Sequence, residues 1–86
     1  MTSEDLKNKI AVVTGAASGI GAAISKTFAA KGAKLGLLDI DEAAVKAAAA
    51  DMVSDGMDAI GIYCDVAREA ECETAIKAVV EHYGGI

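Results

Sequence analysis

The stretch that decides the fold is Thr14-Gly15-Ala16-Ala17-Ser18-Gly19-Ile20-Gly21, a glycine-rich segment between two apolar ones. Residues 10–13 before it read Ile-Ala-Val-Val, a short β-branched run that is typical of a buried strand. After it, residues of an apolar pattern recur at helical spacing: Ile20, Ala23, Ile24, Thr27 and Phe28. The sequence therefore predicts a tight turn that joins a buried strand to a helix.

A helix that begins at such a turn offers a site for an anion. The first amides of a helix have no intrahelical partner, and the helix dipole adds partial positive charge there, so a diphosphate fits well. We assign Gly15 to the turn, Gly19 to close approach of a phosphate, and Gly21 to close approach of the helix to the first strand. A plain glycine-rich turn is the alternative, because three spaced glycines alone are not specific.

Length and composition allow one small domain at most. The 86 residues carry a net charge of −5, which argues against nucleic acid or an anionic membrane surface as a partner. Residues 1–7 contain acids and no apolar core, unlike a signal peptide, and residues 10–30 contain Gly, Ser, Thr and Lys26, unlike a membrane span. We therefore expect a cytoplasmic protein that binds neither nucleic acid nor membrane.

The cysteines and the histidine form no recognisable metal or redox motif. Cys64 and Cys72 match neither a metal-ligand spacing nor a CxxC pair, so we expect two buried, reduced thiols. His82 is the only histidine and is expected on the surface near a helix C-terminus. A solvated helix face is expected to carry Glu69, Glu71, Glu73 and Glu81. No metal site is predicted.

Three expected strands alternate with three expected helices. The strands are residues 9–14, 33–38 and 59–64, and the helices are residues 19–31, the segment between Asp41 and Gly56, and residues 67–83. This β-α-β-α-β-α order predicts an α/β fold with a parallel three-stranded sheet, strand order 3-2-1, flanked by helices. Such a unit is half of a doubly wound, Rossmann-like domain.

Capping residues and apolar stripes refine this prediction. Asp41 is a plausible N-cap, whereas Ala67 is a weak one, and glycines at 32, 56 and 84–85 are suited to end the helices. The apolar stripe of the second helix is Val45, Ala48, Ala49, Met52 and Val53. The buried face expected for the last helix is Cys72, Ile76, Val79, Val80 and Tyr83.

The polar residues that follow the strands predict a nucleotide site. Ligands of such sheets bind beyond the carboxyl ends of the strands, where the glycine turn, Asp39 and Asp65 all fall. The Asp39 carboxylate can accept hydrogen bonds from both hydroxyls of an adenosine ribose and would repel a 2′-phosphate. Neither the turn nor Ile40 supplies a cation, so NAD is favoured over NADP. The alternative for Asp39 is a helix cap.

The adenine ring would lie beside the third strand. Asp65 could reach the adenine amino group, with Val66 against one face of the ring and Ile40 covering the other. An aspartate after a strand is also a common turn or cap residue, and this alternative stays open for Asp65.

On these residues the sequence resembles the short-chain dehydrogenase/reductase family. The resemblance is carried by Thr14-Gly15-x-x-x-Gly19-x-Gly21, by Asp39, by Asp65-Val66, and by the segments Leu6-Lys7-Asn8-Lys9 and Tyr83-Gly84-Gly85-Ile86. It implies an oxidoreductase that moves a hydride between NAD(H) and an alcohol/carbonyl pair. It further implies that Ser18 and Ile20 contact the pyrophosphate and its ribose, Asp39 the adenosine ribose, and Asp65 and Val66 the adenine.

The resemblance covers only the first third of a family member. The family's Asn-Asn-Ala-Gly segment, catalytic Ser and Tyr-x-x-x-Lys pair are absent from these 86 residues. Neither tyrosine is followed by a lysine at the required spacing, because Ala67 stands four positions after Tyr63 and the sequence ends three positions after Tyr83. We therefore expect residues 1–86 to be the N-terminal, cofactor-binding part of one incomplete domain, inactive alone. Its first strand would be an exposed edge, so we expect a homo-oligomer or self-association.

Two other functions stay open. The chain could be a non-catalytic module, or an orphan fragment, that binds an adenine dinucleotide. A methyltransferase-like Rossmann domain would also carry an acid after its second strand, but it does not require Gly-x-x-x-Gly-x-Gly.

Overall fold

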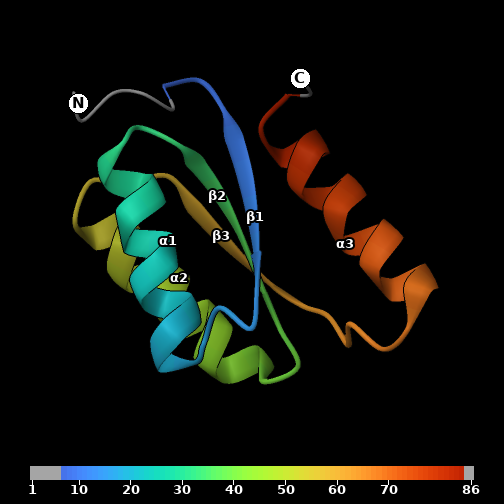
Figure 1. The fold of residues 1–86 in the computed structure, drawn as a ribbon. Helices are drawn as coiled ribbons and strands as arrows, with labels where there is room; N and C mark the ends of the chain where they lie inside the picture. The colour runs from blue at the N-terminus through green and yellow to red at the C-terminus, as the bar shows by residue number, and fades with distance from the viewer. Residues whose placement is uncertain (1–6, 85–86) are drawn as a thin grey trace.

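A computed structural model of the chain describes residues 7–84 (Figure 1). Along the chain the elements are β1 (Ile10–Thr14), α1 (Gly19–Ala30), β2 (Lys34–Asp39), α2 (Glu42–Ser54), β3 (Ala59–Tyr63) and α3 (Glu69–His82). This alternation confirms the predicted α/β fold. The interpretations placed on residues 1–6, including Leu6, and on Gly85 and Ile86 lie outside the described residues.

The described strands form one parallel sheet with β2 in the centre. β1 pairs with β2 from Ile10↔Lys34 onward, and β2 pairs with β3 from Leu35↔Ala59 onward. The order β1-β2-β3 is the predicted 3-2-1 order seen from the other edge. All three strands therefore end at the same edge of the sheet, where the segments expected to bind a nucleotide begin.

Within residues 7–84, helices cover both faces of the sheet, two on one side and one on the other. Figure 1 shows α1 and α2 against one face and α3 against the opposite face. The two-helix face has a core of Val13, Ala16, Ala33, Leu35, Leu37, Val45, Ala49 and Met52. The one-helix face has a smaller core of Leu38, Cys64, Ala75 and Val79. Successive residues of β2 point to opposite faces, which places Leu37 and Leu38 in different cores.

The helix ends follow the predicted capping chemistry except at the start of α3, and Gly84 follows α3 with a φ of 83°. The Asp41 side chain accepts a hydrogen bond from the Ala44 amide at 3.1 Å, which confirms it as the N-cap of α2. Gly32 and Gly56 follow α1 and α2 with φ of 93° and 85°, the left-handed conformation that favours glycine. α3 begins at Glu69, later than expected, and its cap residue Arg68 makes no side-chain cap hydrogen bond.

The buried face of α1 differs from its apolar stripe. Ile20 is 79% exposed and Ile24 is 43% exposed, whereas Gly21 and Ser25 are the buried residues of the helix. Small residues face inward because α1 lies close to the preceding turn. The buried Ser25 hydroxyl is satisfied, since it donates to the Gly21 carbonyl at 2.8 Å.

The stripes of α2 and α3 also need corrections. On α2, Val45, Ala49 and Met52 are buried as expected, but Val53 is exposed. On α3 the buried residues are Ala75 and Val79. Three of the residues expected there are only half-buried, namely Cys72, Val80 and Tyr83, and Ile76 is exposed. Each helix therefore buries a narrower face than its sequence pattern suggests.

No helix within residues 7–84 is both long enough and apolar enough to cross a membrane.

Candidate functional site

A shallow hollow of about 180 Å³ lies where the strands end. It is lined by Gly15, Asp39, Ile40, Cys64, Asp65 and Val66. These residues follow three different strands, so the parallel register brings them together. Five of the six are residues that the sequence singled out as nucleotide contacts. The sixth, Cys64, was missed, because its position gave no sign that it borders the same hollow as Asp39.

The remaining predicted residues form the turn and the start of α1, outside this lining. They are Ser18, Gly19, Ile20 and Gly21. Gly15 adopts a φ of 63°, which fits its assignment to the turn. A Cβ atom added at Gly19 would meet nothing within 4 Å, so the space beside this residue is open. The first turn of α1 thus presents an unobstructed backbone at Gly19.

Gly21 has a packing role that differs in detail from the predicted one. A Cβ atom there would overlap the Gly15 carbonyl and lie 2.8 Å from its carbon and 3.0 Å from the Ala16 Cα. The helix therefore approaches the turn after β1 rather than the strand itself. A glycine is required because backbone atoms occupy the space that a side chain would need.

Ser18 caps the helix and closes the turn at the same time. Its hydroxyl donates to the Gly15 carbonyl at 2.7 Å and accepts from the Gly21 amide at 3.1 Å. A serine hydroxyl has one proton to donate, and here that proton is used within the turn. Any anion beside Ser18 would depend on backbone amides, or on rotation of this hydroxyl away from Gly15.

Asp39 ties the end of β2 to the glycine turn. Its Oδ2 atom accepts from the Ala17 amide and its Oδ1 atom accepts from the Asp41 amide, both at 2.9 Å. The amides of Asp41 and Ala17 hold the pKa of this carboxyl below its usual value, so the side chain is charged at neutral pH. Because Asp41 is the residue that caps α2, the helix-cap alternative for Asp39 is wrong.

Asp65 belongs to a turn that leads into α3. Its Oδ1 atom accepts from the Ala67 amide at 3.0 Å, and its carbonyl accepts from the Arg68 amide at 2.9 Å. The turn role that was left open for Asp65 is therefore present. A carboxylate oxygen can accept a second hydrogen bond, so this role does not conflict with a ligand contact, which stays a prediction.

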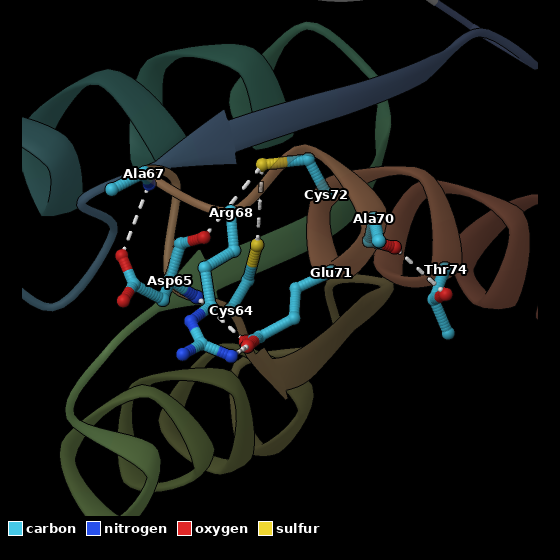
Figure 2. A network of polar contacts seen from close by, with 8 residues as sticks. All are labelled: Cys64, Asp65, Ala67, Arg68, Ala70, Glu71, Cys72 and Thr74. Atoms are coloured by element: carbon cyan, nitrogen blue, oxygen red, sulfur yellow. Dashed lines mark hydrogen bonds and ion pairs between the residues drawn. The ribbon is translucent and has the colours of Figure 1, made fainter.

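A network of polar contacts joins this turn to α3 (Figure 2). Glu71 was expected on a solvated face, but it is half-buried and accepts from the Asp65 amide at 3.3 Å. Its other carboxylate oxygen lies 3.5 Å from Arg68 Nη1. These two contacts hold the turn. Glu71 can reach it because α3 begins only four residues after Asp65. His82 is exposed, as expected.

Cys64 and Cys72 meet in the same network. Both thiols are free, as predicted, but only Cys64 is fully buried, and their Sγ atoms lie 3.7 Å apart. Burial raises the pKa of the Cys64 thiol to about 11, and the neighbouring Cys72 and Glu71 add to the shift. In the described part of the chain, no group of three or more metal-binding side chains is present.

Among the hollows that lie away from the strand ends are two on opposite faces of the sheet, both larger than this one. One, of about 380 Å³, lies between α1 and α2, with Ser25, Lys26 and Asp55 in its wall. The other, of about 420 Å³, is mainly apolar and lies between β3 and α3, beside Tyr63 and Ala78. Neither contains a residue that the sequence predicted as a nucleotide contact, so both are secondary to the hollow at the carboxyl edge.

Comparisons with known proteins identify the family of this chain. Residues 9–86 match the model of the family described as short chain dehydrogenase. The chain is 43% identical over 81 residues to a 2,5-dichloro-2,5-cyclohexadiene-1,4-diol dehydrogenase of Sphingobium indicum, covering 94% of this chain and 32% of that protein. It is also 43% identical to a D-threitol dehydrogenase of Mycolicibacterium smegmatis, covering 94% of this chain and 31% of that protein.

A solved structure matches the fold over nearly the whole chain. The crystal structure of a short chain dehydrogenase/reductase from Burkholderia phymatum in complex with NAD has a TM-score of 0.87 and 34% identity. The match covers 98% of this chain and 29% of that one. The present chain thus spans about a third of the length of the relatives that it matches.

Proposed function

This chain belongs to the short chain dehydrogenase family, and on that premise we propose that it supplies the nucleotide-binding segment of an NAD(H)-dependent oxidoreductase. The reaction would move a hydride between NAD(H) and an alcohol/carbonyl pair. Residues 1–86 would be the N-terminal part of a single Rossmann domain. The observation that carries the proposal is the hollow at which three strands end, bordered by the anchored carboxylate of Asp39.

Within this proposal each residue has a physical role. The open backbone at Gly19 and the start of α1 would receive the diphosphate, with Ile20 beside it. Asp39 would accept the ribose hydroxyls. The amides of Ala17 and Asp41 already fix its position, so binding would not have to order this side chain. The adenine would contact Asp65 with its amino group and lie between the exposed side chains of Ile40 and Val66.

The charge of the hollow supports NAD rather than NADP. Its six lining residues include two carboxylates, Asp39 and Asp65, and no cation. The lowered pKa keeps Asp39 ionised at neutral pH, where it would repel a 2′-phosphate. We therefore expect this chain to bind NADH at least tenfold more tightly than NADPH.

Calorimetric titration of the chain with NADH and NADPH tests this preference. Asp39→Ala is expected to weaken NADH binding by at least tenfold and to narrow the difference between the two nucleotides. Asp41→Ala is the matched control, because it removes a carboxylate two residues away that caps α2 and does not line the hollow. Equal affinities of the unaltered chain for NADH and NADPH, or equal losses in both variants, would contradict the assignment of Asp39.

Gly19→Val tests the diphosphate position separately. The added side chain would enter open space, so the fold should persist while NADH binding is lost. Ala23→Val, at an exposed position in the next turn of α1, is the control for adding a β-branched residue to this helix. NADH binding by Gly19→Val at the affinity of the unaltered chain would place the diphosphate elsewhere.

We propose that the 86 residues by themselves bind the cofactor without turning over a substrate. They contain no Tyr-x-x-x-Lys sequence. Tyr83 is unsuited to proton transfer at the hollow, because its hydroxyl donates to the Leu35 carbonyl at the other end of β2, at 2.7 Å. Burial also raises its pKa to about 12. Turnover of NADH by the isolated chain with a mixture of aldehydes and ketones would contradict this proposal.

The edge of the sheet at β1 supports a further proposal, self-association of the chain. Within residues 7–84, β1 pairs with β2 only, and Val12 on it is partly exposed. Unpaired strand edges readily add another strand. Sedimentation equilibrium should therefore show a dimer or larger species, and Val12→Lys should shift it toward monomer. A monomer at all concentrations would exclude this association.

A further inference from the structure

Two thiols that are eight residues apart in sequence meet beside the proposed nucleotide site. Cys64 directly follows β3 and is 1% exposed, and Cys72 lies on the first turns of α3 and is half-buried. The Cys64 thiol donates to the Cys72 Sγ atom at 3.7 Å, as Figure 2 shows. The Cys72 thiol in turn faces the carbonyls of Val66 at 3.7 Å and Asp65 at 3.9 Å.

We propose that Cys64 and Cys72 are a redox-active pair, which a peroxide converts into an intramolecular disulfide that alters the nucleotide hollow. A disulfide joins its sulfur atoms at about 2.05 Å, so the two sulfurs must approach by only about 1.7 Å from their separation of 3.7 Å. Because the Cys64 thiol already faces the Cys72 sulfur, we expect side-chain rotation with a small shift at the start of α3 to close this gap.

The different surroundings of the two thiols set the order of the reaction. Cys72 is the more exposed and meets the peroxide first. Its thiolate attacks one peroxide oxygen, an S–O bond forms, the O–O bond breaks and hydroxide leaves, giving a sulfenic acid. Cys64 is buried and protonated, because burial raises its pKa to about 11, which makes it a poor first target.

Cys64 then completes the disulfide. Its sulfur attacks the Cys72 sulfur, the S–S bond forms, the S–O bond breaks, and the hydroxyl group leaves as water with the Cys64 proton. Overall, two thiols lose two electrons and two protons, and one peroxide molecule is reduced to two molecules of water. A thiol reductant reverses the reaction by exchange.

The disulfide would act on the hollow because Cys64 borders it. The Cys64 amide donates to the Asp39 carbonyl at 3.0 Å, and the next two residues, Asp65 and Val66, line the same hollow. Pulling the two sulfurs together would draw residues 65–68, which connect Cys64 to α3, toward that helix. The effect on nucleotide affinity rests on the proposed function, whereas formation of the disulfide does not.

Mass spectrometry of the reduced chain tests the pair without any nucleotide. Treatment with one equivalent of hydrogen peroxide should lower the intact mass by two hydrogens and block both thiols to maleimide. A digest should contain a peptide that links Cys64 to Cys72. At a fixed peroxide concentration in excess over protein, the observed rate constant should not depend on protein concentration, and dithiothreitol should restore both thiols. Two thiols that stay reduced, or disulfides only between chains, would overturn the proposal.

Two variants test the order of the reaction. In Cys64→Ala, the sulfenic acid on Cys72 has no partner and should be trapped by dimedone. In Cys72→Ser, the buried Cys64 should remain a thiol under the same treatment. Circular dichroism establishes that both variants are folded. Trapping of a sulfenic acid at Cys64 instead would contradict the assigned order.

Titration with NADH before and after oxidation tests the coupling to the hollow. We expect oxidation to weaken NADH binding at least threefold and reduction to restore it. An unchanged affinity in a chain with a complete disulfide would show that the pair does not control the hollow. If neither form binds NADH, the proposed function fails, and the mass measurements still decide whether the redox pair exists.

Discussion

The two faces of the sheet seat their helices over strand glycines in different ways. On the two-helix face, a Cβ atom on Gly61 of β3 would lie 2.9 Å from the Val45 carbonyl carbon and 3.0 Å from the Lys46 Cα, both in the backbone of α2. On the one-helix face, a Cβ atom on Gly36 of β2 would instead meet the methyl groups of Val79 on α3. The backbone of α2 therefore lies directly over Gly61, whereas only a side chain of α3 lies over Gly36.

This difference decides how well each face can accept an added methyl group. Backbone atoms of α2 cannot move without moving the whole helix, which also packs Val45 and Met52 into the larger core. A valine side chain on α3 can be shortened, and the core around it is smaller. The two-helix face is therefore the rigid part of the fold, and the one-helix face is the adjustable part.

Gly61→Ala should have the largest effect. The added methyl group would collide with the backbone of α2, and we expect this overpacking to lower the unfolding free energy by about 3 kcal/mol. Urea denaturation followed by circular dichroism measures the loss. A cost below about 1 kcal/mol would show that α2 can shift as readily as α3, and that the two faces do not differ in rigidity.

Gly36→Ala should be less damaging and should be rescued by a second change. Overpacking against Val79 is expected to cost about 2 kcal/mol. Val79→Ala makes room for the new methyl group, so the double variant should be more stable than the sum of the single effects by at least about 1 kcal/mol. As a control, Gly61→Ala combined with Val79→Ala should show additive losses. Additive losses of stability in both double variants would contradict the conclusion that Gly36 is opposed by the Val79 side chain.

The smallest effect appears only at high pH, and it belongs to the one-helix face. Burial raises the pKa of Cys64 to about 11 and that of Tyr83 to about 12. In the unfolded chain the values are about 8.5 and 10, so the folded state binds these protons more tightly. Their contribution to stability is complete below about pH 8.5 and is lost as pH rises toward 11 and 12.

Urea midpoints measured between pH 7.5 and 10.5 would show this loss. The unaltered chain should become progressively less stable over that range. Cys64→Ala should flatten the decline from about pH 8.5, and Tyr83→Phe should flatten it from about pH 10. Asp58, whose charge also raises the Tyr83 pKa, provides a matched variant, since Asp58→Asn should lessen the Tyr83 contribution. If the urea midpoint declines with pH equally steeply in the unaltered chain and in all these variants, Cys64 and Tyr83 do not cause the loss of stability at high pH.

The order of the elements could be predicted because it depends on local patterns. Apolar runs of strand length, the cap at Asp41 and the glycines at 32 and 56 are all encoded within a few neighbouring residues. Parallel pairing and strand order then follow from the alternation of strands and helices. These features needed no knowledge of what packs against what.

The orientation of the helices could not be predicted in the same way. Ile20 and Ile76 are exposed while Ser25 and Ala75 are buried, because close approach of a helix selects small residues over large apolar ones. A hydrophobic stripe indicates that a helix has an apolar side. It does not reveal which part of that side the sheet covers.

Some features of the candidate site could also be predicted from the sequence, and others could not. The meeting of Asp39 and Asp65 at one edge followed from the parallel sheet, and the hollow confirms that they lie together. The hydrogen bond from the Ala17 amide to Asp39 joins residues 22 apart, and it depends on the exact path of the glycine turn. The contact between Cys64 and Cys72 likewise depends on the turn before α3, which no spacing rule specifies.

The hydrogen bond of the Tyr83 hydroxyl bears on the order in which this fold assembles. It bonds to the Leu35 carbonyl across 48 residues of chain, whereas the strand pairs Ile10↔Lys34 and Leu35↔Ala59 close loops of half that length. Longer loops cost more entropy before their contacts form, so such contacts come late in folding. The β1-β2-β3 sheet with α1 and α2 is thus expected to assemble first. The last helix of the described chain would be the last to dock and the first to leave.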